Sequence, residues 1–118
     1  MDTLEKAKNA VKILDAKKGS DIKLLEITDC TSIADYYVLC NATSTTHIKS
    51  LADELEFRLE QLGVKPLHIE GRTTKWLVLD YGDVIVHIFT TDSRTFYDID
   101  DLWEQAENID ISELITEN

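Results

Sequence analysis

The stretch KWLVLDYGDVIVHIF, residues 75–89, contains two short apolar runs separated by Tyr81-Gly82. Such runs, rich in aliphatic and β-branched residues and broken by a glycine-containing turn, predict a β-hairpin. Four residues are unusual for a buried hairpin: Trp76, Asp80, Asp83 and His87. An indole, two carboxylates and an imidazole on one hairpin raise the question whether it serves catalysis, metal binding or protein docking.

The position of the turn sets the pairing of this hairpin. A two-residue turn at Tyr81-Gly82 places Asp80 opposite Asp83, and the same register places Trp76 opposite His87. Alternation gives an aliphatic side with Leu77, Leu79, Val84 and Val86 and a mixed side with Trp76, Val78, Ile85 and His87, whereas a bulge at Gly82 would shift this register by one. Facing carboxylates cost stability unless a cationic or hydrogen-bonding group meets them, and a cation is the stronger candidate. Either a binding partner supplies it or an internal side chain does, the internal candidates being Arg72, Lys75 and Arg94.

The rest of the chain alternates between helix and strand patterns. Helices are predicted over residues 2–18, 44–62 and 93–106, and strands over 21–27, 35–42 and 65–70. Asp2 is a candidate N-cap of the first helix, and Ser44 or Thr45 is a candidate N-cap of the second. Gly19 and Gly63 are candidate stops, and Pro66 indicates an edge position or the beginning of its strand. A long helix between two strands indicates a parallel crossover, whereas the hairpin is antiparallel. The sequence therefore predicts an α/β fold with a small mixed β-sheet of about five strands flanked by helices.

Length and net charge limit the functions that the chain could have. The chain has 118 residues, enough for one domain, and a formal net charge of −11. This acidity disfavours binding to nucleic acid and to anionic membranes, and it favours a basic protein partner, although solubility alone would also explain it. No apolar run is long enough to span a bilayer, and Cys30 and Cys40 lack the spacing of a metal site. We expect a reducing, cytoplasmic location.

The residues of an enzyme site do not assemble in the sequence. Gly19-Ser20-Asp21 is similar to the start of a nucleotidyltransferase site, but the following strand lacks the Asp-x-Asp pair that holds the metal ions. Asp98 and Asp100 have that spacing at the other end of the chain, in a predicted helix. For His87, a packed and hydrogen-bonded position is favoured over catalysis. We expect no catalysis, no metal and no cofactor, while a residual nucleotide-binding enzyme and a generic homodimeric adaptor stay open as alternatives.

Three stretches carry a resemblance to a known family. They are ADYYVLCNATSTTHIKSLADEL at 34–55, EGRTTKWLVLDYGDVIVHIF at 70–89 and SRTFYDIDDLWEQA at 93–106. The chain resembles the ribosomal silencing factor family (RsfS, Iojap-related) across Leu4 to Ala106. The resemblance implies a family domain at residues 1–106 followed by an acidic tail at 107–118. It also implies a fold that is nucleotidyltransferase-like without the active site.

The resemblance implies a function as well. Members are non-catalytic translational repressors that bind the large ribosomal subunit through large-subunit ribosomal protein fourteen and block joining of the small subunit. Isolated members form homodimers, and neither a membrane nor sequence-specific nucleic acid binding is expected. Trp76 would be the apolar anchor, and Gly82 would supply the turn. The partner-binding residues that the resemblance implies are Glu70, Gly71, Trp76, Asp80, Tyr81, Asp83, His87, Arg94 and Tyr97.

Overall fold

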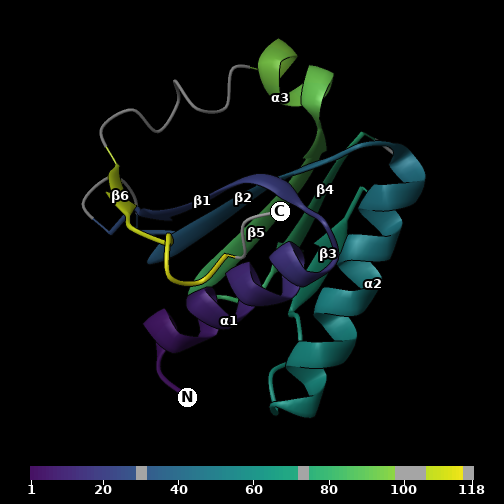
Figure 1. Cartoon of the computed structure of the whole chain (residues 1–118). Helices are drawn as coiled ribbons and strands as arrows, with labels where there is room; N and C mark the ends of the chain where they lie inside the picture. The colour runs from purple at the N-terminus through teal and green to yellow at the C-terminus, as the bar shows by residue number, and fades with distance from the viewer. Residues whose placement is uncertain (29–31, 72–74, 98–105, 116–118) are drawn as a thin grey trace.

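The protein folds as an α/β domain with a mixed sheet. The computed structural model describes residues 1–28, 32–71, 75–97 and 106–115, with residues 95–97 described by their backbone alone. In chain order the elements are α1 (Thr3–Ala16), β1 (Ser20–Glu26), β2 (Tyr36–Ala42), α2 (Thr45–Gln61), β3 (His68–Glu70), β4 (Trp76–Asp80), β5 (Val84–Thr90), α3 (Thr91–Tyr97) and β6 (Glu107–Ile109) (Figure 1). The predicted fold class is confirmed.

The strands lie in the order β3-β4-β5-β2-β1-β6. The central pair, β2 and β5, is parallel, and the other neighbouring pairs are antiparallel. β2 and β3 therefore run in the same direction, as the crossover through α2 predicts, but β5 and β4 lie between them. β3 occupies the predicted edge position.

The sheet has six strands, where the sequence predicts about five. The additional strand is β6, which pairs with the residues of β1 from Leu24 to Glu26. Its residues fall in the predicted acidic tail, and a three-residue strand with one apolar side chain leaves no alternation to detect. The start of the tail thus belongs to the sheet, while the division of the chain at residue 106 stays a prediction.

Helices α1 and α2 cover one face of the sheet (Figure 1). Both predicted N-caps are confirmed: the Asp2 side chain accepts from the amide of Glu5 at 2.8 Å, and the Ser44 hydroxyl accepts from the amide of His47 at 3.1 Å. The fully buried side chains beneath the helices include Val11, Leu14, Leu51, Leu55, Leu77 and Leu79. This face supplies most of the apolar burial that stabilises the domain.

Gly19 follows α1, as predicted for a helix stop, but it is not the residue with the left-handed backbone conformation. The left-handed residue after α1 is Lys18, with φ of 71°. Gly19 is needed because a β-carbon there would lie 2.5 Å from the sulfur of Cys40 and 3.0 Å from the carbonyl oxygen of Leu14. The absence of a side chain lets α1 pack closely on β2.

The second face of the sheet has a separate apolar cluster. Its buried members are Leu25, Ile27, Ala34, Tyr37, Leu39, Ile85 and Phe89. Trp76 and Val78 of β4 pack against this cluster while staying partly exposed. In the described part of the chain, side chains of β4 on this face are thus open to solvent.

Candidate functional site

The β4–β5 hairpin turns at Gly82-Asp83 rather than at Tyr81-Gly82. The amide of Tyr81 donates to the carbonyl of Val84 at 2.9 Å, and Gly82 has φ of 90°. The observed pairs are Trp76–Phe89, Leu77–Ile88, Val78–His87, Leu79–Val86 and Asp80–Ile85. The predicted partners are thus wrong by two residues. Because side chains alternate with a period of two, the predicted division into two faces is confirmed.

The partners of the Asp83 carboxylate belong to helix α1 of the same chain. Its carboxylate oxygens lie 2.8 Å from the ammonium of Lys6 and 2.7 Å from the hydroxyl of Thr3. Partial burial raises the pKa of Asp83, but the hydrogen bonds from Lys6 and Thr3 outweigh it and lower the pKa below its usual value. The internal cation beside Asp83 is therefore Lys6, a residue that was not among the candidates from the sequence.

The predicted internal cations have other positions. Lys75 lies 3.5 Å from a carboxylate oxygen of Asp92, and Arg72 is outside the described residues.

Asp80 does not face Asp83; it lies opposite Ile85, and one of its oxygens accepts from the amide of Gly82 at 2.7 Å. Asp80 therefore stabilises the turn and keeps its second oxygen on the second face of the sheet.

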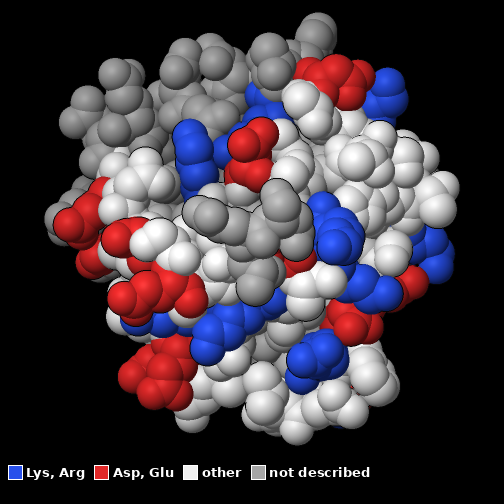
Figure 2. All heavy atoms as spheres, in the orientation of Figure 1, with Lys and Arg blue, Asp and Glu red and all other residues white. Residues whose placement is uncertain are grey.

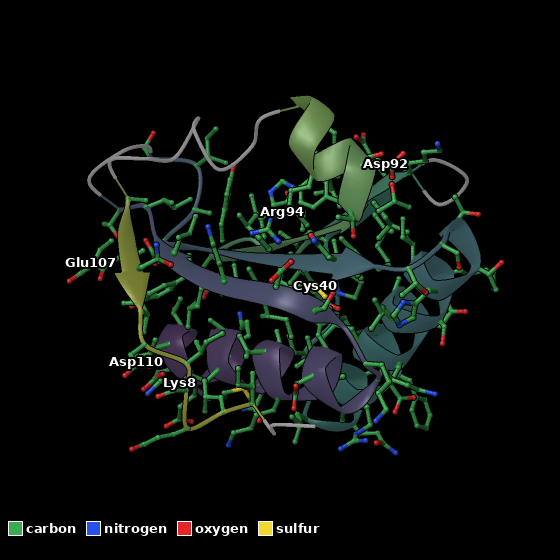
Figure 3. The ribbon with its side chains drawn as sticks, turned by 45° about the horizontal axis from the view of Figure 1, so that its top comes forward. Lys8, Cys40, Asp92, Arg94, Glu107 and Asp110 are labelled. Carbon is green, nitrogen blue, oxygen red and sulfur yellow. The ribbon has the colours of Figure 1, made fainter. Side chains whose placement is uncertain are left out.

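Arg94 is buried, which corrects its predicted place on the partner-binding surface. Its side chain extends from α3 toward the sheet (Figure 3) and is 6% exposed. One guanidinium nitrogen donates to the carbonyl of Asp21 at 2.7 Å and to the side-chain oxygen of Asn41 at 2.8 Å. Arg94 thus joins α3 to β1 and β2. A buried guanidinium with these bonds is a structural group.

Trp76 and His87 form one hydrogen-bonded aromatic unit. The indole nitrogen of Trp76 donates to Nδ1 of His87 at 3.1 Å. The ring centroid of Tyr37 lies 4.6 Å from that of His87, and the indole lies 5.3 Å from the ring of Phe89. The prediction that Trp76 and His87 share a face is confirmed, and so is the packed, hydrogen-bonded position of the histidine.

The imidazole of His87 is neutral. The side chain is 8% exposed, and this burial lowers its pKa to about 4. Since Nδ1 accepts the indole proton, the imidazole proton resides on Nε2. Nε2 is buried and has no hydrogen-bond partner in the described part of the chain. A buried donor without an acceptor destabilises the fold, which makes this position a candidate for a functional compromise.

A shallow hollow of about 270 Å³ lies beside Trp76. Its walls are Glu70, Gly71, Trp76 and Val78, so three of the predicted partner-binding residues meet here. Glu70 and its neighbour on β3, His68, are in contact, with 2.6 Å between Nε2 and the carboxylate. We define the β3–β4 surface as the residues that lie together on this part of the sheet: His68, Glu70, Gly71, Trp76, Val78 and Asp80.

Of the two predicted tyrosines, one can be placed, and it is not part of this surface. Tyr81 points to the opposite face, where it packs in the core under α1 and α2 and is 5% exposed. Its burial raises the pKa of the phenol. Tyr97 ends α3, and its side chain is outside the description.

His68 is the residue that the sequence-based prediction missed. It lies opposite Asp80 in the β3–β4 pairing and on the same face as Glu70. The signal was present in residues 65–70, because strand alternation places His68 and Glu70 on one side.

The described residues offer little for catalysis. Among them, no group of three His, Cys, Asp or Glu side chains lies close enough to hold a metal ion. Burial raises the pKa of the Cys40 thiol to about 12, so it carries no thiolate at neutral pH. Cys30, Asp98 and Asp100 lie outside the described residues. No helix in the described ranges has both the length and the apolar character to cross a membrane.

The family model described as "Ribosomal silencing factor during starvation" matches residues 1–118. The chain belongs to the ribosomal silencing factor family. The ribosomal silencing factor of Halalkalibacterium halodurans is 29% identical over 98% of this chain and 100% of that protein. The one from Haemophilus influenzae is 35% identical over 76% of this chain and 89% of that protein.

Solved structures share this fold, and a plant protein is also similar in sequence. A crystal structure of a protein from Chromobacterium violaceum is 32% identical, with a TM-score of 0.85 over 88% of both chains. A second, from Bacillus halodurans, is 29% identical, with a TM-score of 0.75 over 91% of this chain and 95% of that one. The chloroplastic Iojap protein of Arabidopsis thaliana is 26% identical over 93% of this chain and 46% of its own length. The predicted resemblance is confirmed.

Proposed function

We propose that this protein binds the large ribosomal subunit through large-subunit ribosomal protein fourteen and thereby prevents the small subunit from joining. It acts as a cytoplasmic repressor of translation, by steric exclusion and without catalysis. The observation that carries the proposal is the β3–β4 surface, where an indole oriented by a buried imidazole lines a hollow together with a carboxylate. The membership of the chain in a family of ribosomal silencing factors supports the ribosome as the target.

The chemistry of this surface fits a basic protein. Trp76 provides an amphipathic aromatic side chain, the residue type most enriched at the energetic centres of interfaces. Glu70 and Asp80 provide carboxylates on the same face of the sheet. A net charge of −11 accelerates the approach of a basic partner and repels nucleic acid.

The other side of the molecule is electrostatically different. Figure 2 shows Lys and Arg side chains interleaved with carboxylates on the side that α1 and α2 cover. Half of the cations of the chain lie in its first 23 residues, at positions 6, 8, 12, 17, 18 and 23. A basic partner would therefore meet cations as well as carboxylates on the helical side. In the free protein, we propose, two copies of the chain form a homodimer.

Co-sedimentation with separated ribosomal subunits tests the proposal. We expect the wild-type protein to travel with the large subunit only. Trp76→Ala should lower the affinity by about thirtyfold or more, which is the loss typical of an interface anchor. Asp80→Lys reverses a charge on the surface and should abolish association. Phe57→Ala is the matched control, because Phe57 is an aromatic residue on α2 that is 57% exposed on the helical side.

Two results would contradict the proposal. Failure of the wild-type protein to associate with the large subunit would remove the ribosome as its target. An equal loss in Phe57→Ala and Trp76→Ala would show that association does not depend on the β3–β4 surface.

A further inference from the structure

His68 contacts one carboxylate of the β3–β4 surface and is opposite a second one in the strand pairing. Its Nε2 is 2.6 Å from a carboxylate oxygen of Glu70, and its position on β3 is directly opposite Asp80 on β4. The side chains of His68 and Glu70 are 62% and 70% exposed. The imidazole therefore exchanges protons freely with solvent while it touches a wall of the hollow beside Trp76.

Few other charged groups face this position. Among the described residues of these strands, the titratable groups on the same face are Asp80 on β4, which is opposite His68, the buried and neutral His87 on β5, and Tyr37, which contacts His87 from β2. Burial, and to a smaller extent the charge of Asp80, raises the pKa of Tyr37. No Lys or Arg within the described ranges forms an ion pair with Glu70 or Asp80. Within the described residues, the imidazole of His68 is thus the basic group that contacts a carboxylate of this surface.

The other two histidines of the chain are held in different ways. His87 is buried with a pKa of about 4, so it stays neutral near physiological pH. His47 accepts from the amide of Thr43 through Nδ1 at 2.9 Å, and its Nε2 lies 3.0 Å from the carbonyl oxygen of Lys17. His47 thus joins the start of α2 to the end of α1, away from the β3–β4 surface, and it provides a matched control.

We propose that protonation of His68 weakens docking of the basic partner, so that docking is tightest above neutral pH and declines on acidification. This inference rests on the proposed function. With a neutral imidazole, Glu70 and Asp80 keep their full negative charge for a partner cation. An imidazolium pairs with Glu70 and repels that cation.

The expected change is modest because the groups are exposed. Interactions between exposed charges contribute about 0.2–1 kcal/mol, which corresponds to an affinity loss of up to about fivefold between pH 8 and pH 6. High ionic strength should reduce this loss, since salt screens exposed charges over a distance of about 8 Å at physiological concentration.

Two substitutions at His68 bracket the effect. His68→Gln keeps a hydrogen-bond donor without a titrating charge, so it should bind tightly at both ends of this pH range. His68→Lys carries a permanent charge and should bind weakly at both ends. His47→Gln should follow the wild-type profile. The measurement is the affinity of each full-length variant for the purified large ribosomal subunit at constant ionic strength, from about pH 8 to about pH 6.

The difference between wild type and His68→Gln decides the question, because titrating groups of the partner contribute equally to both. Equal pH profiles for these two proteins would overturn the inference while leaving the proposed function intact. A wild-type affinity that rises on acidification would overturn it as well. Absence of wild-type binding at every pH would instead refute the proposed function, and this inference with it.

Discussion

Replacement of His87 by Phe should raise stability or leave it unchanged while it weakens docking. The imidazole accepts one hydrogen bond, from the indole of Trp76 at 3.1 Å, and carries one buried N–H without an acceptor in the described structure. Phe has a similar planar shape and neither polar atom. The substitution therefore removes both the favourable hydrogen bond from Trp76 and the unfavourable burial of the Nε2–H group.

The balance follows from the two contributions. Loss of the hydrogen bond costs about 0.5–1.5 kcal/mol, and removal of an unsatisfied buried donor returns about 1–3 kcal/mol. The indole N–H can turn to water because Trp76 is only partly buried. At pH 7 we expect a free energy of unfolding between the wild-type value and about 2 kcal/mol above it. Docking should weaken by about fivefold, because the indole has lost the bond that orients it.

Acid should widen the difference in stability. Burial lowers the pKa of His87 in the folded protein to about 4, while an unfolded histidine titrates near 6.5. Between these values the unfolded chain binds a proton that the folded chain excludes, so folding stability falls as the pH falls from about 6.5 to about 4. The wild-type protein should lose roughly 3 kcal/mol from this group over that window, and His87→Phe should lack this component.

Urea unfolding at pH 7 and near pH 4.5, together with co-sedimentation, checks these expectations. A His87→Phe variant that is destabilised by more than about 2 kcal/mol at pH 7 would show that Nε2 has a partner or that Phe does not fit. A double-mutant cycle with Trp76→Phe isolates the orientation effect. In that background the indole N–H is already absent, and His87→Phe should not weaken docking further.

Three further substitutions probe groups that hold the fold together. Gly19→Ala should lower the free energy of unfolding by about 1–3 kcal/mol, because its β-carbon meets the Cys40 sulfur at 2.5 Å, and Cys40→Ala in the same chain should recover most of the loss. Asp83→Asn should cost about 1 kcal/mol by removing the charge-assisted bond from Lys6, and this difference should disappear in acid, where the wild-type carboxyl group is protonated. Arg94→Met should lower stability by about 3 kcal/mol in urea, while below its unfolding temperature it should still bind the large subunit. Loss of binding by folded Arg94→Met would restore the predicted docking role of that residue.

Local patterns predicted much of the fold. The caps at Asp2 and Ser44 act within three residues of the chain, so the sequence contains both members of each bond. The two faces of the hairpin depend only on the alternation of apolar residues, which the sequence displays. The edge position of β3 follows from Pro66 beside it.

Contacts between distant segments were not predictable in this way. Alternation distinguishes the two faces of a strand but not registers that differ by two residues, and the true turn was therefore missed. The ion pair between Lys6 and Asp83 joins residues 77 positions apart, and neither residue type marks its partner. Arginine is usually exposed, so the sequence places Arg94 on the surface. Only the packing of α3 against β1 and β2 shows that its side chain is buried.

The candidate surface and the core share one strand, and their residues alternate along it. In β4 and the turn, Leu77, Leu79 and Tyr81 point under the helices, whereas Trp76, Val78 and Asp80 point to the second face. Substitutions at the first set should therefore reduce stability, and substitutions at the second set should reduce docking. His87 connects the two properties, because it is buried like a core residue but its one acceptor is used to orient Trp76. The hydrogen bond between His87 and Trp76 is therefore the contact through which a change in the core would alter the orientation of the indole on the β3–β4 surface.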